Sequence, residues 1–505
     1  VTDSKDAVIV GDTNEVDTAI DTGSFTTDNI RIIGANNTVK GSKSQVVFGD
    51  SNRIIGRDKG TNSPARTGNQ ADITIGRGNV LQGNFTGRKP WETLTVIGNN
   101  NNGESGLDSA GGIESGIVIG NNQNIADITR SIVIGSLSPE EQKATMVTDD
   151  GDTYLVNRVT LGATIVGYHS TTIGASVVVG NNSKAGGTFD TVTGHFSSIE
   201  TPPPQLFPVA GQSSSIYGSF NKIRANSILD GIGNTVTGTF NNTSEATSSM
   251  IMGMGNTITH AIPKQDDPVA EEAIKTWILY DYTIGKDHFE GDATQTIESI
   301  QPYMKDYSVL GGGAVSILGN ANVSDYAIRS QILGTANEVT GKDGAISALN
   351  TVSGFGNKAE SISRSSIIGT GNELKGGENN VIIGDYHKLK DGKRNVILGS
   401  METREEIIEK VAKSALPSPI GKDAKYTIKK YNPLIDHTKD IEEAVMLGYN
   451  TDVSQNGGVA LGANSIASTK AGIAGYDPIT KEASTATERK WNNREADISK
   501  IILLK

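Results

Sequence analysis

A short pattern of apolar and polar positions recurs along most of the chain. Two adjacent aliphatic residues precede a glycine, and an asparagine with a further apolar residue follows, as in NIRIIGANNTVKG and SSIIGTGNELKGG. Successive repeat glycines often lie 15 residues apart, as from Gly369 to Gly384 to Gly399, and Gly448 to Gly462 is one residue shorter. This period accommodates two short strands and two turns, and it is too short for a helical repeat. The pattern therefore predicts an all-β fold of stacked 14- to 15-residue coils, a parallel β-roll or β-helix.

The glycine and the asparagine of the repeat both favour turns. Glycine suits a turn with positive φ or a close backbone approach. Asparagine tolerates a left-handed conformation, and copies in successive coils can hydrogen-bond to one another as a ladder. We expect turns at Gly34, Gly49, Gly120, Gly135, Gly334, Gly369, Gly384, Gly399 and Gly462, and a ladder through Asn37, Asn52, Asn221, Asn234, Asn256, Asn337, Asn357 and Asn372.

The two strands of the repeat differ in their pattern. After the asparagine, polar and apolar residues alternate, as in Thr38-Val39-Lys40, which is typical of a strand with one buried face. Before the glycine the apolar residues are adjacent, as in Ile32-Ile33. Neighbouring residues of a strand point to opposite faces, so one member of each pair must face away from the coil interior. A lone coil stack would expose this apolar stripe to water, and the pattern therefore predicts self-association along it.

Segments without the repeat divide the chain. One contains the helix-like PVAEEAIKTWILYDY, and another opens with METREEIIEKVAKSAL, for which we also predict a helix. The expected organisation is a roll with short loop insertions over 1–259, a large insertion at 260–307, a second stretch of roll at 308–400, a second large insertion at 401–444, the last coils at 445–478, and a neck-like transition at 479–505.

Composition and charge narrow the range of partners. The 505 residues include 60 glycines, no cysteine and only 5% aromatic residues, as expected for a thin core of β-branched side chains between many turns. The lack of cysteine excludes disulfides and thiolate chemistry. A net charge of −12 opposes attraction to nucleic acid and to anionic membranes. We expect no nucleic-acid partner and no direct membrane insertion, since no apolar run approaches the length of a membrane-spanning helix.

The segment from Gly458 to Pro478, GVALGANSIASTKAGIAGYDP, resembles the end of a head domain in trimeric autotransporter adhesins, the YadA-like surface proteins of Gram-negative bacteria. Its ALGANSIA portion is similar to the coil of those heads, and AGIAGYDP with the later Trp491 resembles the segment before their neck. The upstream coils are similar to the same heads, although the DAVNVAQL-like run of the family's neck is absent.

This resemblance implies a left-handed parallel β-roll joined as a homotrimer, with the strand before the glycine facing the threefold axis. It implies a non-enzymatic adhesin at the bacterial cell surface, exported by type V secretion and anchored in the outer membrane by a region C-terminal to this sequence. Partners in the family are host cell-surface glycoproteins, for example of the CEACAM (carcinoembryonic-antigen) type, or the matrix proteins collagen, fibronectin and laminin. The positions assigned to the trimer interface and coil repeat are Ile32, Val46, Val118, Val133, Ile367, Ile382 and Ile397.

The residues give little support for catalysis, and we expect no catalytic residue, metal or cofactor. The histidines lack the spacing of paired metal ligands, so surface or turn roles are favoured for His169, His195, His260, His288, His387 and His437. The main alternative function is a carbohydrate-active β-helix enzyme of the tailspike or lyase kind, which would need clustered carboxylates on one face. The repeat lacks recurrent pairs of Asp or Glu, which favours the adhesin.

A binding role needs side chains that stand clear of the coils. The insertion at 260–307 gathers aromatic residues, which carry much of the energy of protein interfaces. The alternative is that these residues pack the insertion onto its own coil or a neighbouring protomer. The candidates for receptor binding are Trp277, Tyr280, Tyr282, Phe289, Tyr303, Tyr307, Arg88, Lys89 and Trp91.

Overall fold

The chain divides into two units in a computed structural model. The first unit comprises Val1–Ser249 and Gln265–Gly311, and the second comprises Met250–Lys264 and Gly312–Lys505. The structure describes residues 1, 4–17, 19–20, 23–24, 27–55, 72–82, 94–101, 116–123, 131–143, 145–147, 153–155, 162–172, 176–187, 189–201, 213–226, 230–262, 301, 313–412, 423–468, 476–477 and 482–483.

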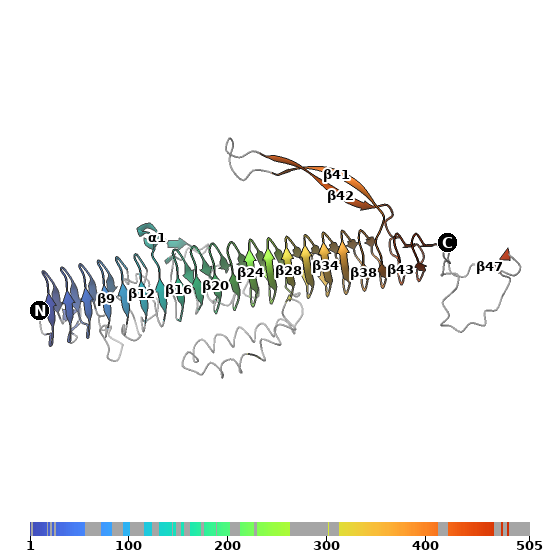
Figure 1. Ribbon diagram of the computed structural model, residues 1–505. Helices are drawn as coiled ribbons and strands as arrows, with labels where there is room; N and C mark the ends of the chain where they lie inside the picture. Colours follow the sequence, from blue (N-terminus) through green and yellow to red (C-terminus); the bar gives the residue numbers. More distant parts are fainter. Residues whose placement is uncertain are drawn as a thin grey trace. The chain divides into compact units, whose positions relative to one another are not determined.

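The first unit is a stack of β coils (Figure 1). The strands that lead into the repeat glycines, here called glycine strands, pair in parallel with the same register from coil to coil, as in Arg31↔Val46, Ile32↔Val47 and Ile33↔Phe48. In stacking order they are β1 (Val8–Val10), β5 (Arg31–Ile33), β7 (Val46–Phe48), β9 (Ile73–Ile75), β11 (Thr95–Ile97), β12 (Ile117–Ile119), β13 (Ile132–Ile134), β16 (Thr164–Val166), β18 (Val177–Val179), β20 (Thr191–Thr193), β22 (Ser215–Tyr217) and β24 (Thr235–Thr239).

The strands that follow the repeat asparagines, here called asparagine strands, form the opposite wall of each coil. They also pair in parallel and in register, as in Val16↔Val39. One group in the first unit is β2 (Glu15–Asp17), β6 (Thr38–Lys40), β8 (Arg53–Ile55) and β10 (Val80–Gln82), and the other is β17 (Thr171–Thr172), β19 (Lys184–Ala185), β21 (Ser198–Glu200), β23 (Lys222–Arg224) and β25 (Asn242–Ala246).

The second unit repeats this coil. Its glycine strands are β26 (Met250–Met254), β28 (Ser316–Asn320), β31 (Gln331–Thr335), β34 (Thr351–Phe355), β36 (Ser366–Thr370), β38 (Val381–Ile383), β40 (Val396–Leu398), β43 (Val445–Leu447) and β45 (Val459–Leu461). Its asparagine strands are β27 (Thr257–Ala261), β29 (Val323–Asp325), β32 (Glu338–Thr340), β35 (Lys358–Glu360), β37 (Glu373–Lys375) and β39 (Lys388–Lys390), followed by the pair β44 (Asp452–Val453) and β46 (Ile466–Ala467). A third parallel contact joins β30 (Ala327–Ile328) to β33 (Ser347–Ala348). The predicted all-β stack of parallel coils is thus confirmed.

The coil interior holds one side chain from each wall. In the glycine strands the central residue points inward, so Ile32 and Val118 are fully buried whereas Ile33 and Ile119 are 48% and 37% exposed. On the opposite wall Val39 and Leu374 are buried between polar neighbours. The predicted division of each aliphatic pair between the interior and the outer surface is confirmed, because the strand period of two places neighbours on opposite faces.

The repeat glycines lie where the backbones of successive coils approach most closely. The nine glycines named above have positive φ values from +95° to +157°. A Cβ atom built on Gly34 would lie 1.9 Å from the carbonyl oxygen of Gly49 in the next coil. No other residue fits this position, because its side chain would overlap the backbone above it.

The asparagines form the expected hydrogen-bonded ladder inside the turn. In the second unit the Nδ2 atom of Asn357 donates to Asn337 Oδ1 at 2.9 Å and to the carbonyl of Gly369 at 2.7 Å. Its own Oδ1 accepts from Nδ2 of Asn372 at 2.9 Å. The side-chain amides of these ladder residues are therefore satisfied, which offsets the cost of burying polar groups in so thin a core. Asn234 is an exception to the prediction, since it precedes β24 and bonds with Ser214 and Ser249 in a second column.

Asp190 occupies that second column, where neighbouring coils carry Ser176, Ser214 and Asn234. Its carboxyl oxygens accept bonds from the N–H groups of Ser214 at 2.9 Å and Gly187 at 2.8 Å. Burial nevertheless raises its pKa well above the usual value of 3.8, against the lowering effect of these two bonds.

The raised pKa of Asp190 makes the first unit relatively more stable in mild acid. Above about pH 4 the unfolded chain loses this proton while the folded chain keeps it until its own higher pKa, so the stability contribution falls as the pH rises through that interval. We expect the unfolding free energy of the natural chain, minus that of Asp190→Asn, to decrease between pH 4 and pH 7 in urea titrations. A difference that stays constant or increases would contradict this.

One predicted helix is wrong. The segment METREEIIEKVA forms a strand, β41 (Thr403–Ala412), paired antiparallel with β42 (Ala424–Pro433) in register from Thr403↔Pro433 to Ala412↔Ala424. Its Glu, Lys and Met residues favour a helix, but AKYTIKKYNP supplies a β-branched and aromatic partner strand across a proline-containing connection. The other predicted helix, within 260–307, lies outside the described residues.

A few short elements lie outside the two walls of the coils. The helix named among the described residues is α1 (Pro139–Lys143). Three short hairpins pair β3 (Ala19–Ile20) with β4 (Gly23–Ser24), β14 (Thr145–Val147) with β15 (Thr153–Leu155), and β47 (Tyr476–Asp477) with β48 (Glu482–Ala483).

Candidate functional surfaces

The outer face of the glycine strands in the first unit is largely apolar, with Thr and Ser at some outward positions. Because the register is constant, the outward residues form two continuous columns, one on each side of the buried central column. Among these outward positions Arg31 alone carries a charge. The most exposed aliphatic and aromatic members include Val10, Ile33, Phe48, Ile75, Ile119, Ile134, Val179 and Tyr217, between 37% and 56% exposed.

The second unit presents the same kind of face. Its outward columns are built from aliphatic, Met, Ser, Thr and Gln residues, and none of the positions described there is charged. Near its C-terminal coils the columns are almost entirely aliphatic. The members exposed by more than a third include Met252, Leu318, Ile368, Ile383, Leu398 and Leu461.

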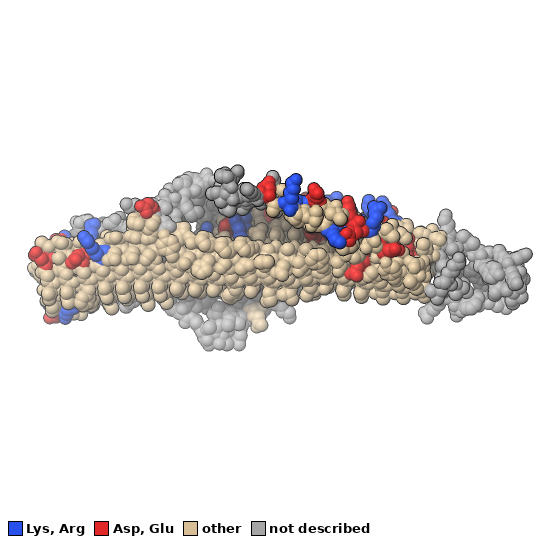
Figure 2. Space-filling model, turned by 45° about the horizontal axis from the view of Figure 1, so that its top comes forward, with Lys and Arg blue, Asp and Glu red and all other residues tan. Residues whose placement is uncertain are grey.

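The asparagine strands turn a different face to solvent. Their outward residues pair across coils, as in Lys40–Glu15 at 2.7 Å in the first unit and Lys375–Glu360 at 2.8 Å in the second. Figure 2 shows coil surfaces almost free of charged side chains beside regions where Lys, Arg, Asp and Glu gather. Exposed ion pairs contribute little to stability. The difference between the two outer faces therefore concerns which of them is exposed to solvent. Each unit therefore has one apolar and one hydrophilic wall.

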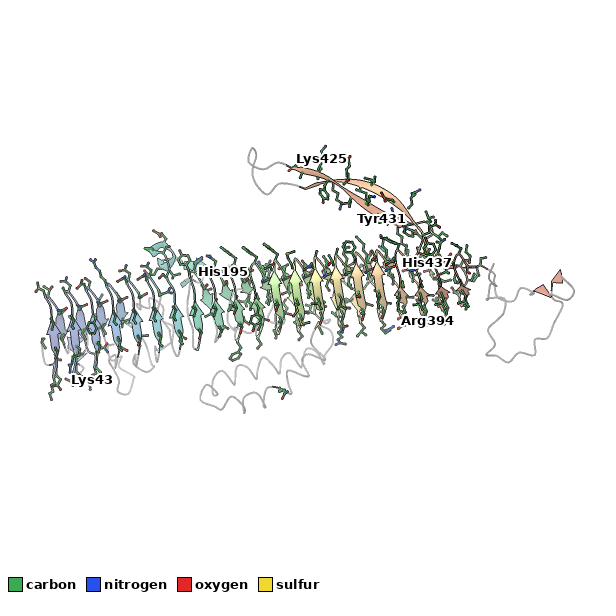
Figure 3. The ribbon with its side chains drawn as sticks, in the orientation of Figure 1. Lys43, His195, Arg394, Lys425, Tyr431 and His437 are labelled. Atoms are coloured by element: carbon green, nitrogen blue, oxygen red, sulfur yellow. The ribbon has the colours of Figure 1, made fainter. Side chains whose placement is uncertain are left out.

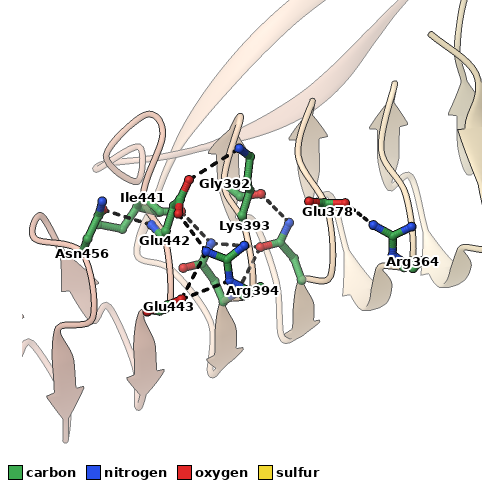
Figure 4. Close-up of polar contacts among 11 residues, drawn as sticks. Arg364, Glu378, Gly392, Lys393, Arg394, Ile441, Glu442, Glu443 and Asn456 are labelled. Carbon is green, nitrogen blue, oxygen red and sulfur yellow. Dashed lines mark hydrogen bonds and ion pairs between the residues drawn. The ribbon is translucent and has the colours of Figure 1, made fainter. Parts of the chain in front are cut away.

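A charged ladder also follows the turns at the C-terminal coils of the second unit (Figure 4). Arg394 bonds Glu442 at 2.9 Å and Glu443 at 3.2 Å, and Arg364 pairs with Glu378. Arg364 and Arg394 both have positive φ, so the ladder lines a column of left-handed turn positions. These ion pairs are exposed and hold neighbouring turns together, which is a structural role.

Three phenylalanines form an exposed stack on the first unit. Phe196, Phe220 and Phe240 are 57%, 48% and 61% exposed, and neighbouring rings are nearly parallel with centroids 5.4 and 4.9 Å apart. All three have positive φ, at a turn position that other coils fill with Asn36 or Asn182. A bulky residue in this conformation is strained by about 1 kcal/mol. Because the left-handed conformation is strained for phenylalanine, the stability of the backbone does not explain why these residues are present. The Phe stack is therefore a candidate contact surface.

We expect Phe220→Asn to change the unfolding free energy of the first unit by less than about 1 kcal/mol. The relief of left-handed strain offsets the lost contacts between partly exposed rings. The matched control is Ile223→Ala, three residues further on, where a fully buried side chain is removed at a cost of about 3 kcal/mol. Urea denaturation measures both. A loss above about 2 kcal/mol in Phe220→Asn would show that the rings stabilise the coil stack.

The strands β41 and β42 form a two-stranded ribbon, Thr403–Pro433, that leaves the coils of the second unit between β40 and β43 (Figure 1). Both of its faces are largely exposed, and Ile407, Val411 and Tyr426 are 66%, 49% and 47% exposed. Tyr431 lies at its base, and its ring contacts Tyr386 of the coil stack with centroids 5.7 Å apart (Figure 3). An isolated two-stranded ribbon is only marginally stable in water, so its exposed apolar residues are candidates for contact with a partner.

The histidines within the described ranges are not grouped as metal ligands. Among the described residues no group of three or more His, Asp or Glu side chains could hold a metal ion. His195 is exposed and His260 bonds Asp325 at 2.7 Å, in keeping with surface and turn roles. His387 and His437 are different, because they are buried and bond to each other at 3.0 Å. His288 lies outside the described residues.

All nine predicted receptor-binding residues, in 83–93 and 263–312, lie outside the described part of the chain. The ribbon and the Phe stack were both missed from the sequence. The recurring Gly-x-Phe at Gly194, Gly218 and Gly238 was the available signal for the stack, because each phenylalanine directly precedes the ladder position.

The positions assigned to the trimer interface need correction. Ile32, Val118, Val133, Ile367, Ile382 and Ile397 are buried inside the coil of a single chain, and only Val46 faces outward. The inward residue stands two positions before the glycine, whereas the outward residues stand one and three positions before it. A surface contact would instead involve residues such as Ile33, Ile119 and Ile368.

No helix among the described residues is long and apolar enough to cross a membrane. A scan of protein-family models and a search of curated proteins found no match to the chain.

Proposed function

We propose that the chain is the head of a trimeric autotransporter adhesin, a non-enzymatic surface protein that attaches a Gram-negative bacterium to host receptors or matrix proteins. In this proposal three copies bury their glycine-strand faces around a common axis. The hydrophilic asparagine strands and the insertions remain outside, where they can meet a partner.

The observation that carries the proposal is the outer face of the glycine strands, which is uncharged at every described outward position except Arg31. A soluble protein rarely leaves an apolar surface of this length uncovered. The constant register repeats the same outward columns in every coil, so a second and third copy meet a matching surface along the whole of each unit. The sequence resemblance of the coils to YadA-like heads agrees with this arrangement.

The ribbon and the Phe stack are the described candidates for partner contact. Both expose aromatic or aliphatic side chains that the coil does not need for its own packing. Trimerisation would present three copies of each, so that weak individual contacts add up through avidity. The aromatic insertion at 260–307 remains a further candidate.

Attachment of protein-coated beads tests the proposal. Beads carrying the chain are expected to bind cultured epithelial cells or at least one of immobilised collagen, fibronectin, laminin and a carcinoembryonic-antigen-type receptor. Two variants test the described surfaces in the same assay. One replaces residues 404–432 by a short Gly-Ser turn, and the other replaces Phe196, Phe220 and Phe240 by Asn. Circular dichroism checks that the β coils of each variant remain folded. Failure of the natural chain to bind any of these surfaces would contradict the adhesin function.

The same preparation tests the enzymatic alternative. Incubation with bacterial and host polysaccharides is expected to release no new reducing ends and no unsaturated products. Steady release of either at enzyme concentrations in the nanomolar range would support a tailspike- or lyase-like enzyme instead.

A further inference from the structure

The asparagine ladder of the second unit ends in two histidines and an aspartate. The regular ladder runs through Asn357 and Asn372 and continues to His387, whose backbone N–H donates to Asn372 Oδ1 at 2.9 Å. The Nε2 atom of His387 lies 2.7 Å from the carbonyl oxygen of Gly399, as the amide of Asn372 lies 2.8 Å from that of Gly384. His387 thus takes the place of a ladder asparagine.

The next ladder position belongs to His437, the residue at which the chain returns from the ribbon to the coils (Figure 3). Its backbone N–H donates to the carbonyl of Lys388 at 3.0 Å. Its Nε2 atom lies 3.0 Å from His387 Nδ1, and its Nδ1 atom lies 2.9 Å from Asp452 Oδ1. The side chain of His437 is fully buried and that of Asp452 is 12% exposed.

The direction of each hydrogen bond fixes the protons. The Gly399 carbonyl only accepts, so His387 donates from Nε2. Burial lowers the pKa of His387 to about 4, which keeps the ring neutral at ordinary pH and makes its Nδ1 an acceptor. His437 must therefore donate from Nε2. A bond between its Nδ1 and Asp452 then needs one more proton, held on the imidazole or on the carboxyl.

With all of these hydrogen bonds made, the three side chains carry one extra proton. The comparison is with two neutral histidines and an ionised aspartate that do not contact one another. Without the extra proton, a buried imidazole lone pair faces a carboxylate, and one of the two bonds of His437 is lost. Other charged groups near these side chains include Asp385, Lys388 paired with Glu373 at 3.9 Å, and Lys439 paired with Asp391 at 3.8 Å and Asp440 at 3.5 Å. Asp436 directly precedes His437 in the sequence. None of them is hydrogen-bonded to His437 in the structure, so none replaces the missing proton.

We infer that the His387–His437–Asp452 chain is a proton-dependent latch that holds the root of the ribbon on the coils of the second unit. The N–H of Leu434 closes the ribbon on the carbonyl of Glu402 at 2.8 Å, and His437 follows three residues later. The latch is intact while the extra proton is present and weakens as the pH rises and that proton is lost. This device goes beyond adhesion and does not depend on it.

Hydrogen exchange of the full chain, read by mass spectrometry, tests the latch. After correction for the intrinsic pH dependence of exchange, the amides of Leu434 and His437 are expected to lose about tenfold or more of their protection between pH 5.5 and pH 8.5. The amide of Gly371, bonded to Phe355 in the same unit, is the internal reference and should not change.

Two variants separate the latch from an ordinary ion pair. In Asp452→Asn the new amide can donate to His437 Nδ1, which satisfies every bond without an extra proton. This variant should keep the protection and lose its pH dependence, whereas His437→Ala should lose protection at both pH values. The inference is overturned if the natural chain shows no pH step, or if Asp452→Asn is as unprotected as His437→Ala.

Discussion

Replacing Gly354 by alanine should lower the unfolding free energy of the second unit by about 3–5 kcal/mol. Gly354 has a φ of +127°, and a Cβ atom there would lie 1.9 Å from the carbonyl oxygen of Gly369 in the next coil. The clashing atom belongs to the backbone of the next coil, and the strand pairing of the following coils holds that backbone in place. A local shift that would make room for the Cβ atom is therefore difficult. Urea denaturation followed by circular dichroism measures the change.

Gly356, two residues later in the same turn, is the matched control. It also has a positive φ, of +65°, but a Cβ atom there would meet nothing within 4 Å. Gly356→Ala should cost only about 1 kcal/mol, and Gly356→Asn close to nothing, since asparagine tolerates this conformation. Equal costs for Gly354→Ala and Gly356→Ala would show that conformation alone, and not the approach of the coils, requires the repeat glycine.

Introducing lysine at Ile368, Ile383 and Leu398 should weaken self-association by about 1000-fold or more, equivalent to about 4 kcal/mol. These residues stand in one outward column of the second unit and are 44%, 44% and 37% exposed in the single chain. In the proposed assembly each copy would bury three unpaired ammonium groups close to those of its neighbours. Sedimentation velocity over a concentration series measures the effect.

The control places the same charges on the opposite wall of the same unit. Thr257, Val323 and Thr340 occupy outward positions of the asparagine strands, where Lys and Glu are common. Their replacement by lysine should leave both the fold and the assembly unchanged. If both triple variants assembled equally, or both dissociated, the glycine-strand face would not be the site of association.

The stacked-coil fold could be predicted from the sequence because its signals are local and repeated. Gly369, Gly384 and Gly399 each mark a close approach that no other residue allows, and their spacing gives the coil length. What could not be predicted was the inward member of each aliphatic pair. Ile367 and Ile368 are chemically alike, and only the register of the strand against its neighbours decides which one is buried.

The features specific to this chain depend on distant pairings. The strand conformation of Thr403–Ala412 is set by its partner Ala424–Pro433, and without that partner its charged composition favours a helix. The two ladder histidines lie 50 residues apart in sequence and meet only after the ribbon has returned to the coils. His387 was visible as a departure from the ladder asparagine, but nothing in the sequence pointed to His437 as its partner.

The mass of the purified chain in solution tests the central claim most directly. Sedimentation equilibrium at micromolar concentration should give three times the 53.1 kDa mass of the chain, with little binding of a hydrophobic dye. A folded species that stays at 53.1 kDa up to the highest soluble concentration, again without dye binding, would contradict the proposal that three copies cover one another's apolar face.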